Sequence, residues 1–165
     1  MAEADSMFKK FPDMGKKERI LYVLLLTLIL LTLSFIFVQS SLSPSASGQE
    51  SDAVAGFLSA IFPSDGFIIS NLRQIAHFAE YGVLGVWTSL FVCFFAIKVR
   101  ASALASFAAA QCVALIDETI QIFSGRVADV VDVWTDFLGF LTFSAIVYLA
   151  FFALIRNRKK DLANG

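Results

Sequence analysis

Residues 20–38 form a run of 19 amino acids without a charged side chain. An α-helix rises about 1.5 Å per residue, so a helix over this run nearly spans the roughly 30 Å hydrocarbon core of a bilayer. A secretory signal is the alternative, because basic residues precede the run and small residues follow it. The run is longer than the core of about 7 to 15 residues in a usual signal, so we interpret it as a retained membrane span.

Three further apolar segments follow the first one. With 58% hydrophobic residues and a mean hydropathy of +0.74, the chain lies outside the range of soluble globular proteins. It contains no nucleic-acid-binding motif and no Gly-rich phosphate loop, so we expect the lipid bilayer, and no nucleic acid, as a partner. We predict an all-α membrane protein, a four-transmembrane-helix bundle at residues 20–155. Its spans are expected at about 20–38, 72–97, 101–123 and 132–155, between a polar segment at 1–19 and a basic tail at 156–165.

The connection between the first two spans is predicted to have two parts. Residues 40–50 are rich in Ser and contain Pro and Gly, which is typical of a loop. After them, apolar residues recur at the spacing of an amphipathic helix that ends near a turn at 64–66, namely Val54, Phe57, Leu58 and Ile61. We expect this helix at the membrane interface; a loop with apolar anchors is the alternative.

Individual residues in and after the second span predict how the later helices pack, begin and end. The segment 101–123 is rich in Ala, and small side chains let helices approach closely in lipid, so we expect this span at the centre of the bundle. Gly125 is well placed to end that helix, and Asp129 to cap the next one. Cys93 and Cys112 lie in apolar runs and are interpreted as buried packing residues.

The distribution of charge predicts the orientation in the membrane. Assigning 1–19, 98–100 and 156–165 to the cytoplasm places 11 of the 13 Lys and Arg residues there, which satisfies the positive-inside rule. Arg73 and Arg126 are left outside, together with nine of the 14 acidic residues. We therefore predict a multi-pass protein of the cytoplasmic membrane with both termini in the cytoplasm.

Ionisable residues gather at the predicted outer side. The stretch 117–139 carries five acidic residues between two apolar segments, and such groups at membrane depth usually face a protein interior or a watery cavity and have a role. At helical spacing, residues 73, 77 and 81 share one face of the second span, with Glu80 about 60° away. A second face carries acids at i, i+3 and i+7, namely Asp129, Asp132 and Asp136. We predict that these faces converge on one pocket.

Three motifs, HFAEYGVLG at 77–85, DETIQIFSGR at 117–126 and DVWTDFLG at 132–139, resemble the VanZ-like family of small bacterial membrane proteins. The resemblance covers about residues 70–155. It implies matched positions at His77, Tyr81, Glu118, Gln121, Arg126, Asp132, Asp136 and Gly139. Asp136 stands where many members carry Asn, which adds an acid here. The eponymous member is linked to teicoplanin resistance, and the family implies no agreed reaction.

The residue types at these positions indicate specific chemistry. His77 is the single histidine of the chain and suits either proton transfer or metal binding, although a structural hydrogen bond is equally open. Carboxylates suit a divalent cation, whereas Asp129 and Asp132 also favour the positive end of a helix without any ion. Arg126 either pairs with an acid of the cluster, Glu118 or Asp132, or binds an anionic head group. Asp117 is interpreted as turned toward the interface.

The candidate residues fall into three groups. The catalytic candidates are His77, Glu118 and Asp132. The substrate-binding candidates are Arg73, Tyr81, Gln121 and Arg126. The candidates for a divalent cation are Glu118, Asp132 and Asp136.

Two functional hypotheses follow from these residues. The first is an enzyme or binding protein that acts on a lipid-linked or cell-envelope substrate at the outer leaflet. The second is a non-enzymatic scaffold or subunit in which the same residues form a structural network. A transporter is a third option, but four spans are few for a single-chain pathway.

Overall fold

The computed structural model describes residues 11–61, 71–127 and 129–164, and helices account for most of them. Four helices are long and apolar enough to cross a membrane, which confirms the predicted all-helical, four-span architecture. The predicted turn at 64–66 and residues 1–10 of the polar N-terminal segment lie outside the described residues. The elements in order are η1 (Phe11–Asp13), α1 (Lys16–Ser40), α2 (Pro44–Ile61), α4 (Leu72–Phe95), α5 (Val99–Phe123) and α6 (Val130–Asn164).

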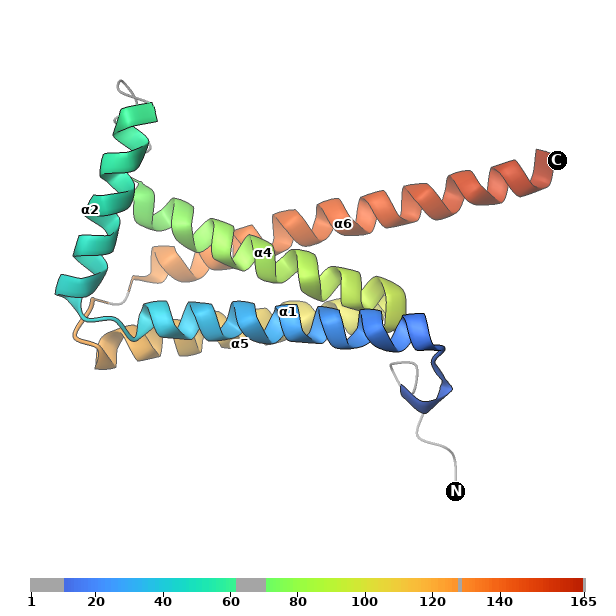
Figure 1. The fold of residues 1–165 in the computed structure, drawn as a ribbon, viewed down its shortest axis with the longest axis horizontal. Coiled ribbons are helices and arrows are strands. Elements are labelled where there is room, and N and C mark those ends of the chain that lie inside the picture. Colours follow the sequence, from blue (N-terminus) through green and yellow to red (C-terminus); the bar gives the residue numbers. More distant parts are fainter. Residues whose placement is uncertain (1–10, 62–70, 128, 165) are drawn as a thin grey trace.

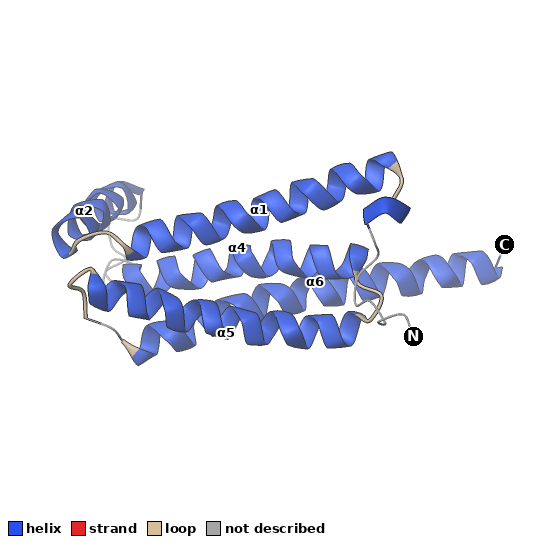
Figure 2. Cartoon of the chain, turned by 90° about the horizontal axis from the view of Figure 1, so that it is seen from below, coloured by secondary structure: helices blue, strands red, loops and turns tan. Residues whose placement is uncertain are grey.

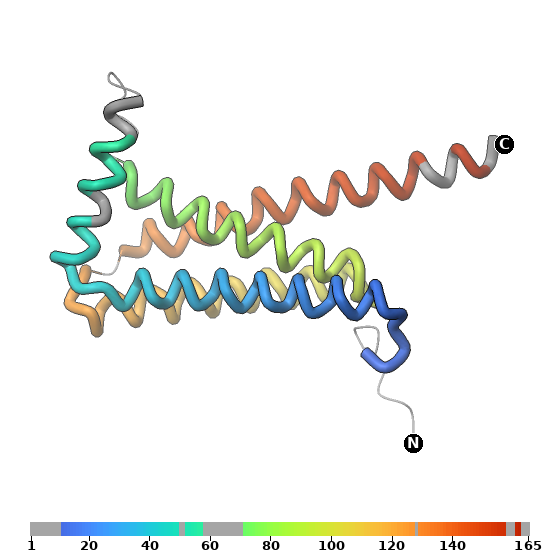
Figure 3. The backbone as a smooth tube through the Cα atoms, in the orientation of Figure 1, coloured from blue at the N-terminus to red at the C-terminus, as the bar shows by residue number. Residues whose placement is uncertain are grey.

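The four long helices alternate in direction, as Figure 1 shows. The end of α1, the start of α4, the end of α5 and the start of α6 meet at one end of the bundle, and the two chain termini lie toward the other. Helix α6 runs through the basic segment and extends beyond the other helices (Figure 3). This alternation brings the two polar sequence stretches to the same level of the bundle, as predicted from four consecutive spans.

Helices α4 and α6 form the most extensive helix pair, and α4 also contacts α1, α5 and α2. Glycines allow α4 and α6 to approach closely. A Cβ atom at Gly139 would lie 2.3 Å from the backbone oxygen of Phe78, and one at Gly85 would lie 2.7 Å from that of Phe140. The central helix is therefore α4, and the prediction that 101–123 is central was wrong. The Ala content of α5 misled because Ala105, Ala108 and Ala109 are exposed, so they do not mediate packing between helices.

Apolar contacts complete the bundle in two clusters. One contains Ile36, Tyr81, Ala114 and Phe140, and so joins α1, α4, α5 and α6. The other lies around Leu25 and Phe95. Cys93 is buried as predicted, whereas Cys112 is exposed on α5, because it faces away from the other helices. Figure 2 shows the long helices of the bundle from a second direction. Large apolar side chains cover much of their outer surface, as expected for helices surrounded by lipid.

Helix α2 begins much earlier than the sequence suggested. The predicted loop at 40–50 shrinks to residues 41–43, because Pro44 starts a helix that continues to Ile61. Proline is favourable at the first helical position, where its missing N–H costs nothing, and the preceding Ser43 accepts a hydrogen bond from the Ala46 N–H at 3.4 Å. The helix lies steeply across the ends of the long helices (Figure 1). Its location at a membrane interface stays a prediction.

Candidate functional site

Five ionisable side chains are buried together where the ends of the long helices meet. His77 comes from α4, Asp117 and Glu118 from the last turns of α5, and Asp132 and Asp136 from the first turns of α6. The two aspartates of α6 are 0% exposed, although each carries a carboxyl group. We call these five residues the acidic cluster.

His77 lies at the centre of the acidic cluster. Its Nδ1 is 2.9 Å from Oδ1 of Asp136 and 3.9 Å from Oδ2 of Asp117, and its Nε2 is 3.9 Å from Oδ2 of Asp132. When Nδ1 carries the proton, it donates to Asp136, and the lone pair of Nε2 faces Asp132. The contact with Asp136 therefore leaves Nε2 as the imidazole nitrogen that can accept a proton or bind a ligand.

Asp117 is an inward-facing member of the cluster, not an interfacial residue as predicted. It accepts hydrogen bonds from the Ser40 hydroxyl and, at 3.3 Å, from Nε2 of Gln121. Sequence reasoning missed Ser40 because it is an uncharged residue at the end of the first span. Its position at the C-terminal end of that span, which the alternating spans bring level with Asp117, was the signal that could have found it.

Arg73 makes the ion pair that was predicted for Arg126. Its Nη2 lies 2.7 Å from Oδ2 of Asp132 and donates at 2.8 Å to Oε1 of Gln121, so one side chain joins α4, α5 and α6. Arg126 instead donates at 3.4 Å to the carbonyl oxygen of Gln39 at the end of α1. Burial lowers the pKa of Arg126, and the neighbouring positive charge of Arg73 lowers it further.

The α5–α6 turn determines the direction of Arg126. Gly125 has a φ of +80°, and the Arg126 N–H donates to the carbonyl oxygen of Gln121 at 2.9 Å, which is the Schellman ending of a helix. On the other side of the turn, Asp129 accepts from the Val131 N–H at 2.8 Å and so caps α6. Both predictions for these residues are confirmed. The turn places Arg126 against the end of α1.

Glu118 connects the cluster to this turn. Its Oε2 accepts a hydrogen bond from the Asp129 N–H at 2.9 Å, which links the end of α5 to the start of α6. Its other oxygen, Oε1, is buried and has no hydrogen-bond partner among the described residues. The free oxygen is available to a ligand.

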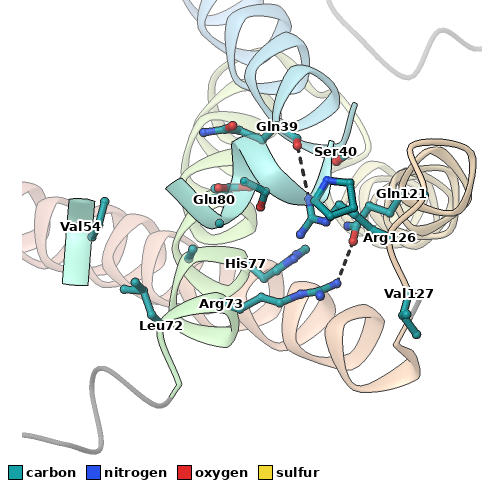
Figure 4. Close-up of a pocket in the computed structure, with 15 residues that line it drawn as sticks. Gln39, Ser40, Val54, Leu72, Arg73, His77, Glu80, Gln121, Arg126 and Val127 are labelled. Atoms are coloured by element: carbon teal, nitrogen blue, oxygen red, sulfur yellow. Dashed lines mark hydrogen bonds between the residues drawn. The ribbon is translucent and has the colours of Figure 1, made fainter. Parts of the chain in front are cut away.

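A cavity of about 530 Å³ lies beside the acidic cluster, bounded by α1, α2, α4 and the α5–α6 turn. Figure 4 shows Arg73, His77 and Glu80 reaching it from α4, with Gln121 and Arg126 opposite. Tyr81, a predicted substrate-binding residue, is completely buried in the apolar core and does not line this cavity. The structure thus brings three of the four predicted substrate-binding residues together.

Two sets of three side chains have donor atoms within 4.8 Å of one another, a spacing compatible with one metal ion. The first set is His77, Glu118 and Asp132, and the second is His77, Asp117 and Asp136. The predicted set of Glu118, Asp132 and Asp136 is not one of them. His77 is common to both sets, because it lies between the two pairs of carboxylates.

Fold and site together define a multi-pass α-helical membrane protein with a buried cluster of ionisable residues at one end of the bundle. A profile of the VanZ/LLP1 family matches residues 20–153, which is most of the chain. The protein therefore belongs to the VanZ-like family, and the resemblance noted in the three motifs extends over all four spans. Neither the curated proteins nor the solved structures contain a match.

Proposed function

We propose that this protein binds an anionic head group of a lipid-linked or cell-envelope substrate in the cavity, at the outer leaflet of the cytoplasmic membrane. The observation that carries the proposal is that two guanidinium groups, those of Arg73 and Arg126, line the same cavity at the end of the bundle. The predicted topology, with both termini in the cytoplasm, places that end on the outer side.

Arg126 is the group best suited to receive an anion. Among the described residues its side chain donates to a neutral carbonyl oxygen, at 3.4 Å, whereas Arg73 is already paired with Asp132. A guanidinium forms two parallel hydrogen bonds with a phosphate or carboxylate, and it does so more strongly where water is scarce. An anionic head group would relieve the repulsion between the two arginines.

The cavity also has the size and lining of a ligand site. Its volume of about 530 Å³ lies within the range of about 300 to 1,000 Å³ of small-molecule pockets. Val54, Leu72 and Val127 supply apolar walls beside the two arginines. A lipid presents the same combination of an anionic head and an apolar chain.

His77 gives this cavity a possible chemical function beyond binding. The imidazole lines the cavity and is held by Asp136 at 2.9 Å, an arrangement suited to general acid or base catalysis on a bound head group. In an enzymatic form, His77 transfers the proton and Arg126 neutralises developing charge.

Lipid retention tests the proposal directly. The protein is purified in mild detergent, and the lipids that remain bound are identified by mass spectrometry for the natural protein, Arg126→Ala and Arg100→Ala. Arg100 is an exposed arginine at the start of α5, at the opposite end of the bundle, and serves as the matched control. We expect Arg126→Ala to retain at least about tenfold less anionic lipid, which corresponds to about 1.4 kcal/mol. Equal retention by both variants would contradict the proposal.

A cellular measurement extends the test to the phenotype implied by the family. We propose that expression of the protein in a sensitive bacterium changes the inhibitory concentration of teicoplanin, and that Arg126→Ala abolishes the change. An unchanged inhibitory concentration for the natural protein would remove the resistance part of the proposal and leave the lipid-binding part intact.

A structural role is the second candidate, and a specific set of contacts favours it. Arg73 joins α4 to α5 and α6, and Asp117 joins α5 to Ser40 of α1, so the polar network links all four spans. If that is its whole function, Asp117→Asn and Asp132→Asn will lower the melting temperature and leave lipid retention per folded molecule unchanged.

A further inference from the structure

Three carboxylate oxygens of the acidic cluster are buried with neither a hydrogen bond nor an ion pair among the described residues. They are Oε1 of Glu118, Oδ1 of Asp132 and Oδ2 of Asp136. The Arg73 guanidinium lies on Oδ2 of Asp132, so it leaves Oδ1 unused. Because unpaired buried carboxylates are costly and rare, each of these atoms indicates a missing partner.

The charges of the cluster indicate that this partner is positive. Four buried carboxyl groups face the guanidinium of Arg73, which is ion-paired, the guanidinium of Arg126, which has no ion pair within the described part of the chain, and one imidazole. Even a protonated His77 would leave the ionised cluster with an excess of negative charge. At membrane depth such an excess is unstable unless a cation neutralises it or protons bind.

His77 offers a nitrogen ligand beside the unpartnered oxygens. With Nδ1 directed to Asp136 at 2.9 Å, Nε2 lies 3.9 Å from Oδ2 of Asp132. Ligand bonds of about 2.0 to 2.2 Å join two donor atoms that are up to roughly 4.2 Å apart, so an ion on Nε2 is within reach of the Asp132 carboxyl group, whose Oδ2 also pairs with Arg73. A carboxylate on the far nitrogen of a metal-binding histidine is a common supporting contact.

We infer that His77, Glu118 and Asp132 bind a divalent transition-metal cation, with Asp136 orienting the imidazole. The rival set, with Asp117 and Asp136, is less suitable because both oxygens of Asp117 already accept hydrogen bonds and Oδ1 of Asp136 contacts His77. One imidazole and two carboxylates suit Zn²⁺ or Mn²⁺, whereas Ca²⁺ requires six to eight oxygen ligands. The metal site shares His77 with the cavity and, when occupied, uses the imidazole as a ligand in place of proton transfer, whereas head-group binding by Arg126 does not require the metal.

Metal titration tests this inference. Detergent-solubilised protein is stripped with a chelator, dialysed, and titrated with Zn²⁺ or Mn²⁺ alone, and bound metal is measured by elemental mass spectrometry beside the melting temperature. We expect one equivalent of metal per chain and a higher melting temperature when the metal is bound, because a ligand of the folded state stabilises it. Failure of both ions to bind would overturn the inference, as would equal binding of Ca²⁺.

Two matched variants locate the ion. Asp132→Asn removes a proposed ligand, and Asp129→Asn removes a carboxyl group from the same end of α6 while keeping a good helix cap. We expect Asp132→Asn to weaken metal affinity at least tenfold and Asp129→Asn to change it less than threefold. Equal losses in both variants would show that the ion is attracted only by the overall negative charge, and would overturn the site.

A third variant covers the case in which Asp132→Asn fails to fold. His77→Gln keeps a polar side chain of similar reach and removes the imidazole, and we expect it to lose at least tenfold in metal affinity. Unchanged affinity in His77→Gln would exclude the nitrogen ligand and overturn the inference. Unchanged lipid retention in Arg126→Ala, with metal binding preserved, would count against the proposed function alone.

Discussion

The imidazole of His77 and the carboxyl group of Asp136 form a buried hydrogen bond of 2.9 Å between α4 and α6, the two helices that pack most extensively. The bond places the single histidine of the chain between two pairs of carboxylates, and it determines which ring nitrogen faces Asp132. The motif resemblance implies Asn at the position of Asp136 in many members, so the hydrogen bond and the charge are separate questions here.

Two replacements of Asp136 separate the contribution of its hydrogen bond to stability from that of its charge. Asp136→Asn keeps an oxygen that accepts from His77, so we expect a change below about 1 kcal/mol in the free energy of unfolding. Asp136→Ala leaves the imidazole buried without its partner, and we expect a loss of about 1 to 3 kcal/mol. Equilibrium unfolding in mixed micelles measures both. Equal losses in the two variants would show that the carboxylate charge itself is required.

The contact between Gly139 and Phe78 predicts a steric effect. A Cβ atom in Gly139→Ala would lie 2.3 Å from a backbone oxygen, so α6 must move away from α4, and we expect a loss of about 1 to 3 kcal/mol. The control is Gly56→Ala in α2, where nothing lies within 4 Å of the added atom, and which should be neutral or stabilising by up to about 1 kcal/mol. Gly139→Ala should therefore lower the melting temperature, whereas Gly56→Ala should leave it unchanged or raise it.

Arg73 and Asp132 should be energetically coupled. Arg73→Ala leaves a buried carboxylate without its ion pair; for a fully buried pair the cost is about 3 to 5 kcal/mol. The side chain of Arg73 is 38% exposed, so we expect a smaller loss, about 2 kcal/mol. Adding Asp132→Asn to Arg73→Ala should recover part of that loss. Strictly additive effects in this double-mutant cycle would show that the ion pair contributes nothing.

The orientation in the membrane is testable without any variant of the site. A reporter that is active only in the cytoplasm, fused after Lys160, should be active, because the positive-inside rule places this basic segment there. A periplasmic reporter at the same position should be inactive. The opposite pattern would put the cavity and the acidic cluster on the cytoplasmic side, and the outer-leaflet proposal would be lost.

Much of the architecture was predictable because a bilayer permits few solutions. The uncharged run at 20–38 and the three later apolar segments had to be helices, since every backbone polar group in lipid must be satisfied within the segment. The same spacing rules placed His77 on one face of α4 and Asp132 and Asp136 on one face of α6. The turn signals at Gly125 and Asp129 were equally local, and both were confirmed.

The errors concern choices that local sequence does not contain. Alanine content could not show that α5 is peripheral, because close packing needs a small residue that faces the backbone of the partner helix, as Gly85 faces Phe140 and Gly139 faces Phe78. The start of α2 at Pro44 was missed because Ser and Gly around it are typical of loops. Like the exposed alanines, Cys112 lies on the face of α5 that points away from the other helices.

The amino-acid sequence by itself determined the helices, their alternating order, the family and four of the five residues of the acidic cluster, because these depend on apolar length, spacing and short motifs. Only the tertiary structure decided the partners within the site. It joined Arg73 to Asp132, turned Arg126 toward α1, brought Ser40 to Asp117 and placed Tyr81 in the apolar core. Such pairings depend on the rotation of each helix about its axis. Packing of glycine against backbone establishes that rotation for α4 and α6. No single segment of the sequence encodes it.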